Sequence, residues 1–300
     1  MVSPVSSLDI VVLDNASTDG TSEVLDGYAK KYKNITHVRH RTNIGGNANI
    51  CRAFEMAVTC GKEYAWILCD DDKYDFSNWD AVKAAIKGGD DAILVERKID
   101  FPENNKLPYI INTMAFLPST IYKTKNITSQ VIQNMYVNLY TSFPHLALGC
   151  SLLNNNAQFG ILEKPIVYQD VLMEFHKGTN EQIHHRQKNV NLFSGYISSY
   201  QMIQDKKLRR DCCDVLWLGK SFFYSMRAFW KTNGLYGYNI CDVWNSLSSR
   251  QKLSFVFAGI SVGVKYIFAI DSKYITIFGF RIQKPCKNSD LFVSGGGVKK

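Results

Sequence analysis

Three consecutive carboxylates, Asp70 to Asp72, directly follow the short apolar run Tyr64 to Cys69. The run is typical of a buried strand, and ionised Asp side chains must therefore emerge at its carboxyl end, where open α/β sheets bind ligands. Adjacent negative charges repel one another unless a cation lies between them, and Mg²⁺ or Mn²⁺ takes such oxygen ligands. Alternation along the chain predicts that Asp70 and Asp72 point one way and Asp71 the other. The alternative is a solvated acidic turn without a metal.

Two further polar turns lie closer to the start of the chain. The apolar run Leu8 to Leu13 ends in Asp14 to Thr21, a turn whose short side chains bond their own backbone. The run Ile35 to Val38 is followed by Asn43 to Asn49, where two glycines let the backbone approach a ligand closely. A helix is expected to begin in this second turn, and the free N–H groups at its start favour phosphate.

The apolar spacing from residue 8 to residue 96 predicts strands that alternate with helices. This pattern indicates an α/β fold with a mostly parallel sheet flanked by helices, and it places the polar turns at one edge of that sheet. The stretch from Pro108 to Ile121 has a β-rich pattern, and the last third of the chain favours a helical extension. We therefore divide the chain into a core, residues 1–180, with halves at 1–105 and 106–180, and a C-terminal region, residues 181–300.

The composition is that of a globular protein, with 46% apolar and 21% charged residues among 300. The eight cysteines form no CxxC pair and no zinc spacing, and most of them lie in apolar surroundings, which is typical of buried thiols in a reducing cytosol. No signal peptide opens the sequence and no uninterrupted apolar span occurs in it, so we expect a cytoplasmic protein.

Charge is unevenly distributed along the chain. Residues 1–175 hold 16 Lys and Arg against 20 Asp and Glu, whereas residues 176–300 hold 19 against 7. The basic cluster Lys206 to Arg210 and the aromatic runs Phe222 to Tyr224 and Phe229 to Trp230 together suit the inner face of an anionic membrane. A packed subdomain with a solvated basic face is the alternative. Nucleic acid is not expected as a partner, because no RRM, KH or zinc signature occurs.

The polar turns, in this order and spacing, resemble the motifs of family 2 glycosyltransferases of the GT-A fold. Asp14 to Thr21 is similar to that family's first polar turn, Asn43 to Asn49 to its Asn- and Gly-containing turn, and Asp70 to Asp72 to its DxD-type motif. The resemblance covers residues 8–175. Leu117 to Tyr122 and Phe143 to His145 resemble bacterial sugar transferases that build surface polysaccharides, including those that add deoxyhexoses to O-antigen.

The resemblance implies an inverting, metal-dependent transferase that moves a sugar from a nucleotide-sugar donor to a lipid-linked oligosaccharide. The nucleotide-binding residues that it implies are Asp14, Asn15, Asn43, Gly45, Asn47 and Asp70. Asp70 and Asp72 would hold Mg²⁺ or Mn²⁺, which neutralises the departing nucleoside diphosphate. Some relatives use a downstream His as a further metal or diphosphate ligand, for which His176 is the candidate; otherwise His176 is a surface residue.

Inversion requires a general base at the acceptor hydroxyl, and the family often uses Asp or Glu. No acidic residue occurs here between Glu103 and Glu163. His145 is the titratable group in this window whose ordinary pKa, about 6.5, suits proton abstraction near neutrality. The alternative is that His145 packs at the start of a helix.

The chain departs from the family at its start. The opening strand and helix of the family, an I-I-P-T-Y-N-like stretch, are absent, and that strand normally lies inside the sheet beside the nucleotide. We therefore expect one apolar strand edge to be exposed. Two rival functions stay open: a truncated, transferase-like domain that binds without catalysis, and a metal-dependent nucleotidyltransferase.

Overall fold

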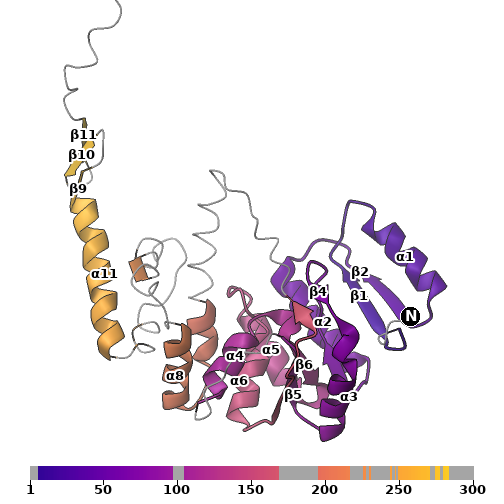
Figure 1. Cartoon of the computed structure of the whole chain (residues 1–300). Helices are drawn as coiled ribbons and strands as arrows, with labels where there is room; N and C mark the ends of the chain where they lie inside the picture. The colour runs from indigo at the N-terminus through magenta and orange to yellow at the C-terminus, as the bar shows by residue number, and fades with distance from the viewer. Residues whose placement is uncertain are drawn as a thin grey trace, which may run out of the picture.

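The structure is a computed structural model that describes residues 6–96, 105–168, 195–216, 226–227, 230, 244, 247, 249–270, 274–277 and 280–283. Figure 1 shows the arrangement of its helices and strands. In chain order they are β1 (Ile10–Asp14), α1 (Thr21–Lys31), β2 (Ile35–Arg39), α2 (Gly46–Thr59), β3 (Tyr64–Trp66), β4 (Lys73–Tyr74), α3 (Trp79–Gly88), β5 (Ala92–Leu94), α4 (Leu107–Thr113), β6 (Thr120–Lys123), α5 (Ser129–Val137), α6 (Leu146–Asn154), β7 (Phe159–Ile161), β8 (Val167–Tyr168), α8 (Lys206–Leu216), α11 (Ser249–Ile267), β9 (Phe268–Ile270), β10 (Tyr274–Ile277) and β11 (Phe280–Gln283).

Two sheets carry the first half of the chain. β1 and β2 form a parallel pair, and a four-stranded sheet has the order β3-β6-β5-β7. β6 runs antiparallel to both of its neighbours, whereas β5 and β7 are parallel. The α/β architecture is confirmed, but the four-stranded sheet is mixed rather than mostly parallel. The physical reason is that β6 returns between β3 and β5, which run in the same direction.

The segment from Pro108 to Ile121 is largely helical, so the prediction of a β-rich stretch was wrong. α4 occupies its first part, and β6 begins only at Thr120. Pro108 lies in the first turn of α4, where its missing N–H costs no helical hydrogen bond. Ile110 and Ile111 of α4 are buried in the core. A short apolar run fits both helix and strand periodicity, and tertiary packing selects the helix here.

Several described strands have an open edge, and β1 is one of them. Among the described strands β1 pairs only with β2, and β3 pairs only with β6. Leu8 and Ile10 beside the β1 edge are 40% and 36% exposed, and Val24, Tyr28 and Tyr32, which share one face of α1 and its C-terminal end, are 40–58% exposed. The structure therefore contains the exposed apolar strand edge expected from the sequence.

The main core includes part of the C-terminal region. Tyr200, Ile203, Cys212 and Cys213 are buried in the same apolar cluster as Phe54 of α2, and α8 packs against α4. Segment 195–216 is therefore part of the core domain's packing. The prediction that these cysteines are buried thiols is confirmed, since Cys212 and Cys213 are buried and not in a disulfide.

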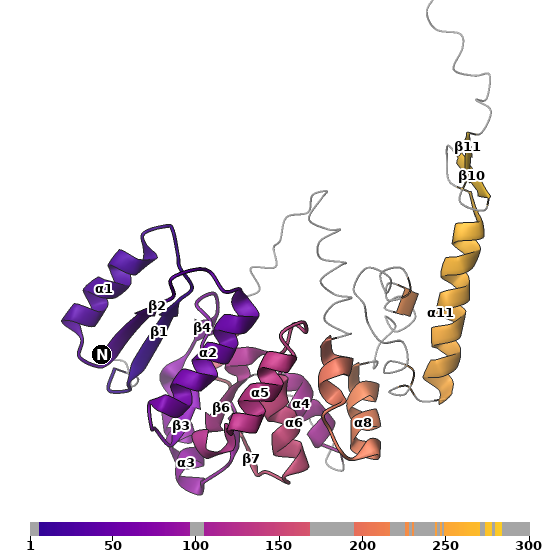
Figure 2. The same cartoon turned by 180° about the vertical axis from the view of Figure 1, so that it is seen from behind.

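α11 packs against a second, smaller cluster. Its Phe255 and Ala258 are buried together with Ile197 and Leu247. β9, β10 and β11 form an antiparallel sheet after it, so the C-terminal region contains strands as well as the predicted helices. α11 and this sheet stand apart from the four-stranded sheet in both views (Figures 1 and 2). Within the described ranges, no helix has both the length and the apolar character needed to cross a membrane.

Candidate active site

One edge of the four-stranded sheet gathers carboxylates from two strands. β3 and β5 are both antiparallel to β6, so their carboxyl ends lie at the same edge. The Asp triplet follows β3, and Glu96 follows β5. Tyr74 of β4 pairs with Val167, and Val167 forms a bridge with Glu96. The backbone after the triplet is therefore about 10 Å, or two strand spacings, from the backbone of Glu96.

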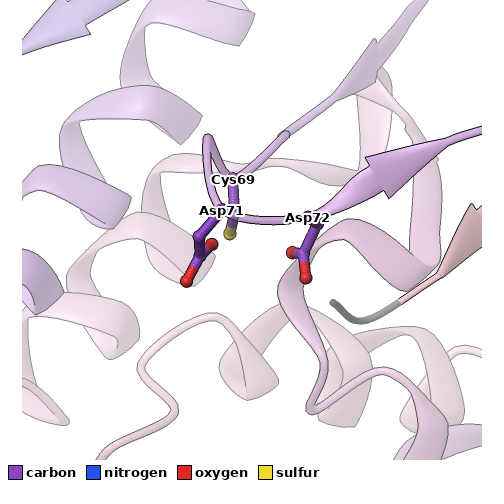
Figure 3. A group of neighbouring side chains, drawn as sticks. All are labelled: Cys69, Asp71 and Asp72. Atoms are coloured by element: carbon purple, nitrogen blue, oxygen red, sulfur yellow. The ribbon is translucent and has the colours of Figure 1, made fainter. Parts of the chain in front are cut away.

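The carboxylates that converge are those of Asp71 and Asp72 rather than those of Asp70 and Asp72. The Cys69 sulfur and one oxygen from each of Asp71 and Asp72 lie within 4.8 Å of one another (Figure 3). Asp70 is exposed and lies outside this group. The alternation that predicted the other pair does not apply, because β3 ends at Trp66 and the triplet lies in a turn.

These residues fit a hard divalent cation. Two carboxylates are a usual protein contribution to an Mg²⁺ site, in which water and phosphate oxygens complete the coordination. Cys69 is not expected to compete, because burial, and then the charges of Asp72, Asp71 and Asp70, raise the pKa of its thiol to about 12. A protonated thiol is a poor ligand for a hard cation. The oxygens of Asp71 and Asp72 are therefore the candidate metal ligands.

Tyr74 holds the acidic turn in shape. Its hydroxyl accepts a hydrogen bond from the Cys69 N–H at 3.0 Å and donates one to the Cys69 carbonyl at 2.8 Å. Its ring packs edge-on against Trp66 at 5.7 Å and stacks on Phe76 at 6.2 Å. The backbone that carries Asp71 and Asp72 is thus fixed at both ends of the turn.

The turns after β1 and β2 form one unit through two asparagines. Asn15 donates from Nδ2 to Asn43 Oδ1 at 3.0 Å, and its Oδ1 accepts from the Ile44 N–H at 2.9 Å. Asn43 Oδ1 also accepts from the Gly45 N–H at 2.9 Å. The structure therefore brings together three of the predicted nucleotide-binding residues, Asn15, Asn43 and Gly45, directly before α2.

Gly45 is the residue on which the shape of this second turn depends. Its φ of 84° and ψ of 154° lie in a region that is essentially restricted to glycine. Gly46 follows as the first residue of α2 and is not among the residues with positive φ. A Cβ added at either glycine would meet no atom within 4 Å, so the two positions differ in backbone conformation and not in available space.

We expect Gly45→Ala to lower the free energy of unfolding by about 1–3 kcal/mol, because Ala is strained at this φ and ψ. Gly46→Ala is the matched control and should be neutral or stabilising, since Ala is the better helix former. Urea denaturation of the two variants measures the difference. Equal stabilities would contradict the left-handed geometry at Gly45.

Asp14 supports the first turn from inside. Its side chain is 0% exposed. Oδ1 accepts from the Ser17 N–H at 2.8 Å, Oδ2 accepts from the Ser22 hydroxyl, and Arg39 lies 3.7 Å from Oδ2. These hydrogen bonds, foremost that of Ser22, hold the pKa of Asp14 well below its ordinary range. The carboxylate is therefore a positioning group, and its burial does not present it to a base or ribose as the resemblance implied.

Asn47 links the two halves of the core. It lies in the first turn of α2 and donates from Nδ2 to the carbonyl oxygens of Leu139 and Thr141, at 2.8 and 2.6 Å. The segment that it fixes leads directly to Phe143 and His145. Asn47 thus shapes the site by holding this segment, while its amide nitrogen is already occupied.

His145 is buried at the start of α6. His145 is only 2% exposed, and its Nε2 lies 3.1 Å from each of the carbonyl oxygens of Met114 and Ala115. Two carbonyl neighbours place the proton on Nε2, and Nδ1 is a buried acceptor without a hydrogen-bond partner in the described structure. Burial lowers the pKa of His145 to about 4. The ring is therefore neutral near pH 7, but an acceptor reaches Nδ1 only after neighbouring side chains move.

Glu96 is an acidic residue of the site that the sequence reasoning missed. Burial, and secondarily the charge of Glu96, raises the pKa of Tyr196 to about 12, so Glu96 and Tyr196 lie near each other. The Tyr196 ring is 4.3 Å from that of Phe143, which in turn is 6.2 Å from the His145 ring. The signal in the sequence was a second strand followed at once by a carboxylate.

His176 lies outside the described residues, and its metal role stays a prediction.

Comparison with known proteins shows what this chain is similar to. The sequence profile of Glycosyl transferase family 2 matches residues 4–149, which include all three polar turns and His145. The abequosyltransferase RfbV of Salmonella typhimurium is 22% identical over 230 residues, a match that spans 66% of this chain and 66% of that protein. A mannosyltransferase of Pyrobaculum calidifontis, solved with GDP-Man and Mn²⁺, aligns over 86% of this chain and 79% of its own, with 15% identity and a TM-score of 0.44. Residues 4–149 therefore form a domain of the family 2 glycosyltransferases.

Proposed function

We propose that this glycosyltransferase moves a hexosyl or deoxyhexosyl group from a nucleotide-sugar donor to a saccharide hydroxyl, with inversion, in the synthesis of a bacterial surface glycan. The observation that carries the proposal is the convergence of Asp71 and Asp72 at the carboxyl edge of the sheet. Similarity to an abequosyltransferase supports a surface-glycan role. We extend the proposal to a lipid-linked acceptor, because the basic C-terminal region suits an anionic membrane surface.

The donor side consists of the acidic turn and the start of α2. Ile50 in α2 and Cys69 in the turn both pack against the main apolar core. Asp71 and Asp72 would hold Mg²⁺ or Mn²⁺, which supplies charge neutralisation to the departing nucleoside diphosphate. The free N–H groups at the start of α2 favour phosphate oxygens, and the Asn15–Asn43 pair keeps that turn in place.

The acceptor side contains two candidate bases. His145 Nδ1 has an unshared lone pair and no hydrogen-bond partner within the described structure, and Glu96 is a partly exposed carboxylate at the same sheet edge as the Asp triplet. The base takes the proton of the acceptor hydroxyl, and the oxygen attacks the anomeric carbon opposite the diphosphate. The bond between that carbon and the diphosphate oxygen then breaks, and its electrons leave with the nucleoside diphosphate.

Product analysis with the purified chain tests this proposal. A panel of CDP-, dTDP-, GDP- and UDP-sugars is incubated with an oligosaccharide acceptor that carries a hydrophobic aglycone. We expect one nucleotide class to release its diphosphate with Mn²⁺ or Mg²⁺ and not with a chelator, while the acceptor gains the mass of one sugar. Pyrophosphate release from nucleoside triphosphates and sugar phosphates would indicate a nucleotidyltransferase instead. Inactivity towards the whole panel, in a folded protein, would favour a binding domain.

A further inference from the structure

α11 has two apolar faces, and only one of them is covered. Phe255 and Ala258 are 2% and 0% exposed, and the Phe255 carbonyl accepts a hydrogen bond from Trp230 Nε1 at 2.8 Å. On the other side, four apolar residues are 41–63% exposed. We call these residues the α11 stripe: Leu253, Val256, Phe257 and Ile260.

The α11 stripe is a continuous surface and not a scatter of single side chains. Its members are spaced three, four and seven residues from Leu253, and such positions share one face of a helix. The covered face already fixes α11 to the protein, so the stripe has no packing role in the described part of the chain. Contiguous exposed apolar surface of this kind marks an interaction site.

The charges around the stripe indicate what covers it. α11 has no acidic residue and carries Arg250, Lys252 and Lys265. The acidic Asp214 of α8 hydrogen-bonds Gln251 of α11, and Lys206 and Lys207 at the start of α8 are exposed. A second copy of α11 would bring like charges together, whereas an anionic bilayer attracts them, and long Lys and Arg side chains reach the headgroups while apolar side chains enter the acyl boundary.

We propose that the α11 stripe lies in the plane of an anionic lipid bilayer and holds the protein at the membrane surface. The sequence pointed to the basic cluster in α8, and the structure adds the apolar residues of α11 as the part that enters the lipid. This inference deepens the proposed function, because a lipid-linked acceptor would lie at the same surface. Binding to lipid itself needs neither donor nor metal.

Vesicle flotation of the full chain tests the proposal. Vesicles of phosphatidylcholine alone are compared with vesicles that also contain phosphatidylglycerol, at low and high salt. We expect flotation with the anionic vesicles, weakened by salt, and a loss of affinity of about tenfold or more in the double variant Leu253→Ser, Phe257→Ser. The double variant Val24→Ser, Val137→Ser is the matched control, because these residues are 58% and 72% exposed on other helices, and it should float as the unmodified chain does.

Three outcomes would overturn the proposal. One is the absence of flotation with either vesicle, and another is flotation of the stripe variant equal to that of the control. The third is a dimer, seen by sedimentation, that the stripe variant disrupts, since a second copy would then cover the stripe. An Asp72→Asn variant is floated in the same experiment. Its lipid binding should persist although its catalysis fails, so a failure of the membrane proposal can be told from a failure of the transferase proposal.

Discussion

Asp72→Asn is expected to lower kcat by about 10²- to 10³-fold, as measured by nucleoside diphosphate release at saturating donor and metal. The loss of one charged oxygen ligand removes several kcal/mol of stabilisation from the departing diphosphate. Asp71→Asn should have an effect of the same size, because the two carboxylates converge. Neither change should reduce stability much, since neither residue is buried.

Asp70→Asn is the matched control for these variants. Asp70 is exposed and outside the converging group, so its replacement should leave kcat within a small factor of the original value. An inactive Asp70→Asn variant together with an active Asp71→Asn variant would show that Asp70 and Asp72, the pair expected from strand alternation, hold the metal. That outcome would contradict the structure of the acidic turn.

His145→Gln is expected to lower kcat by about 10²- to 10⁴-fold, the usual contribution of a general base. Gln is suited to this test because its side-chain N–H₂ can still donate to the Met114 and Ala115 carbonyls that Nε2 approaches. It has no basic nitrogen to replace Nδ1. Circular dichroism verifies the fold, and Glu96→Gln is measured in parallel. Full activity of His145→Gln combined with a large loss in Glu96→Gln would identify Glu96 as the base.

The pH profile adds an independent measurement of His145. A solvated His would impose a fall in kcat/KM below its ordinary pKa of about 6.5. Burial lowers the pKa of His145 to about 4, so kcat/KM should stay level from neutrality down to about pH 5. Because the folded-state pKa is below the unfolded value, the neutral ring's contribution to stability falls as pH drops from about 6.5 towards 4. A fall in kcat/KM below pH 6.5 that is absent from the His145→Gln variant would contradict the burial of His145.

The chemistry-bearing turns could be predicted because each is a local feature of the sequence. An apolar run followed by Asp, Asn or Gly must end at a surface, and β1, β2 and β3 indeed precede the three predicted turns. The family also followed from these turns and their spacing. The side-chain pairings within a turn could not be predicted in this way, because Asp71 and Asp72 converge only after the chain has left the strand.

Other parts of the site depend on contacts between distant segments. Nothing near Asn47 in the sequence shows that its amide is used by the carbonyls of Leu139 and Thr141. The burial of His145 likewise depends on α4, which a β-like apolar pattern concealed. The exposed stripe of α11 could not be told from a core face, since periodicity reports that a face is apolar and not whether another element covers it.

Calorimetric titration of the purified chain with CDP, dTDP, GDP and UDP, with and without Mn²⁺, tests directly whether a metal bridges the donor to Asp71 and Asp72. We expect one of these diphosphates to bind in the presence of Mn²⁺, this binding to be lost with a chelator, and Asp71→Asn and Asp72→Asn each to abolish the metal-dependent part. Diphosphate binding of equal affinity without metal, or unchanged in both variants, would contradict a metal-bridged donor site at Asp71 and Asp72.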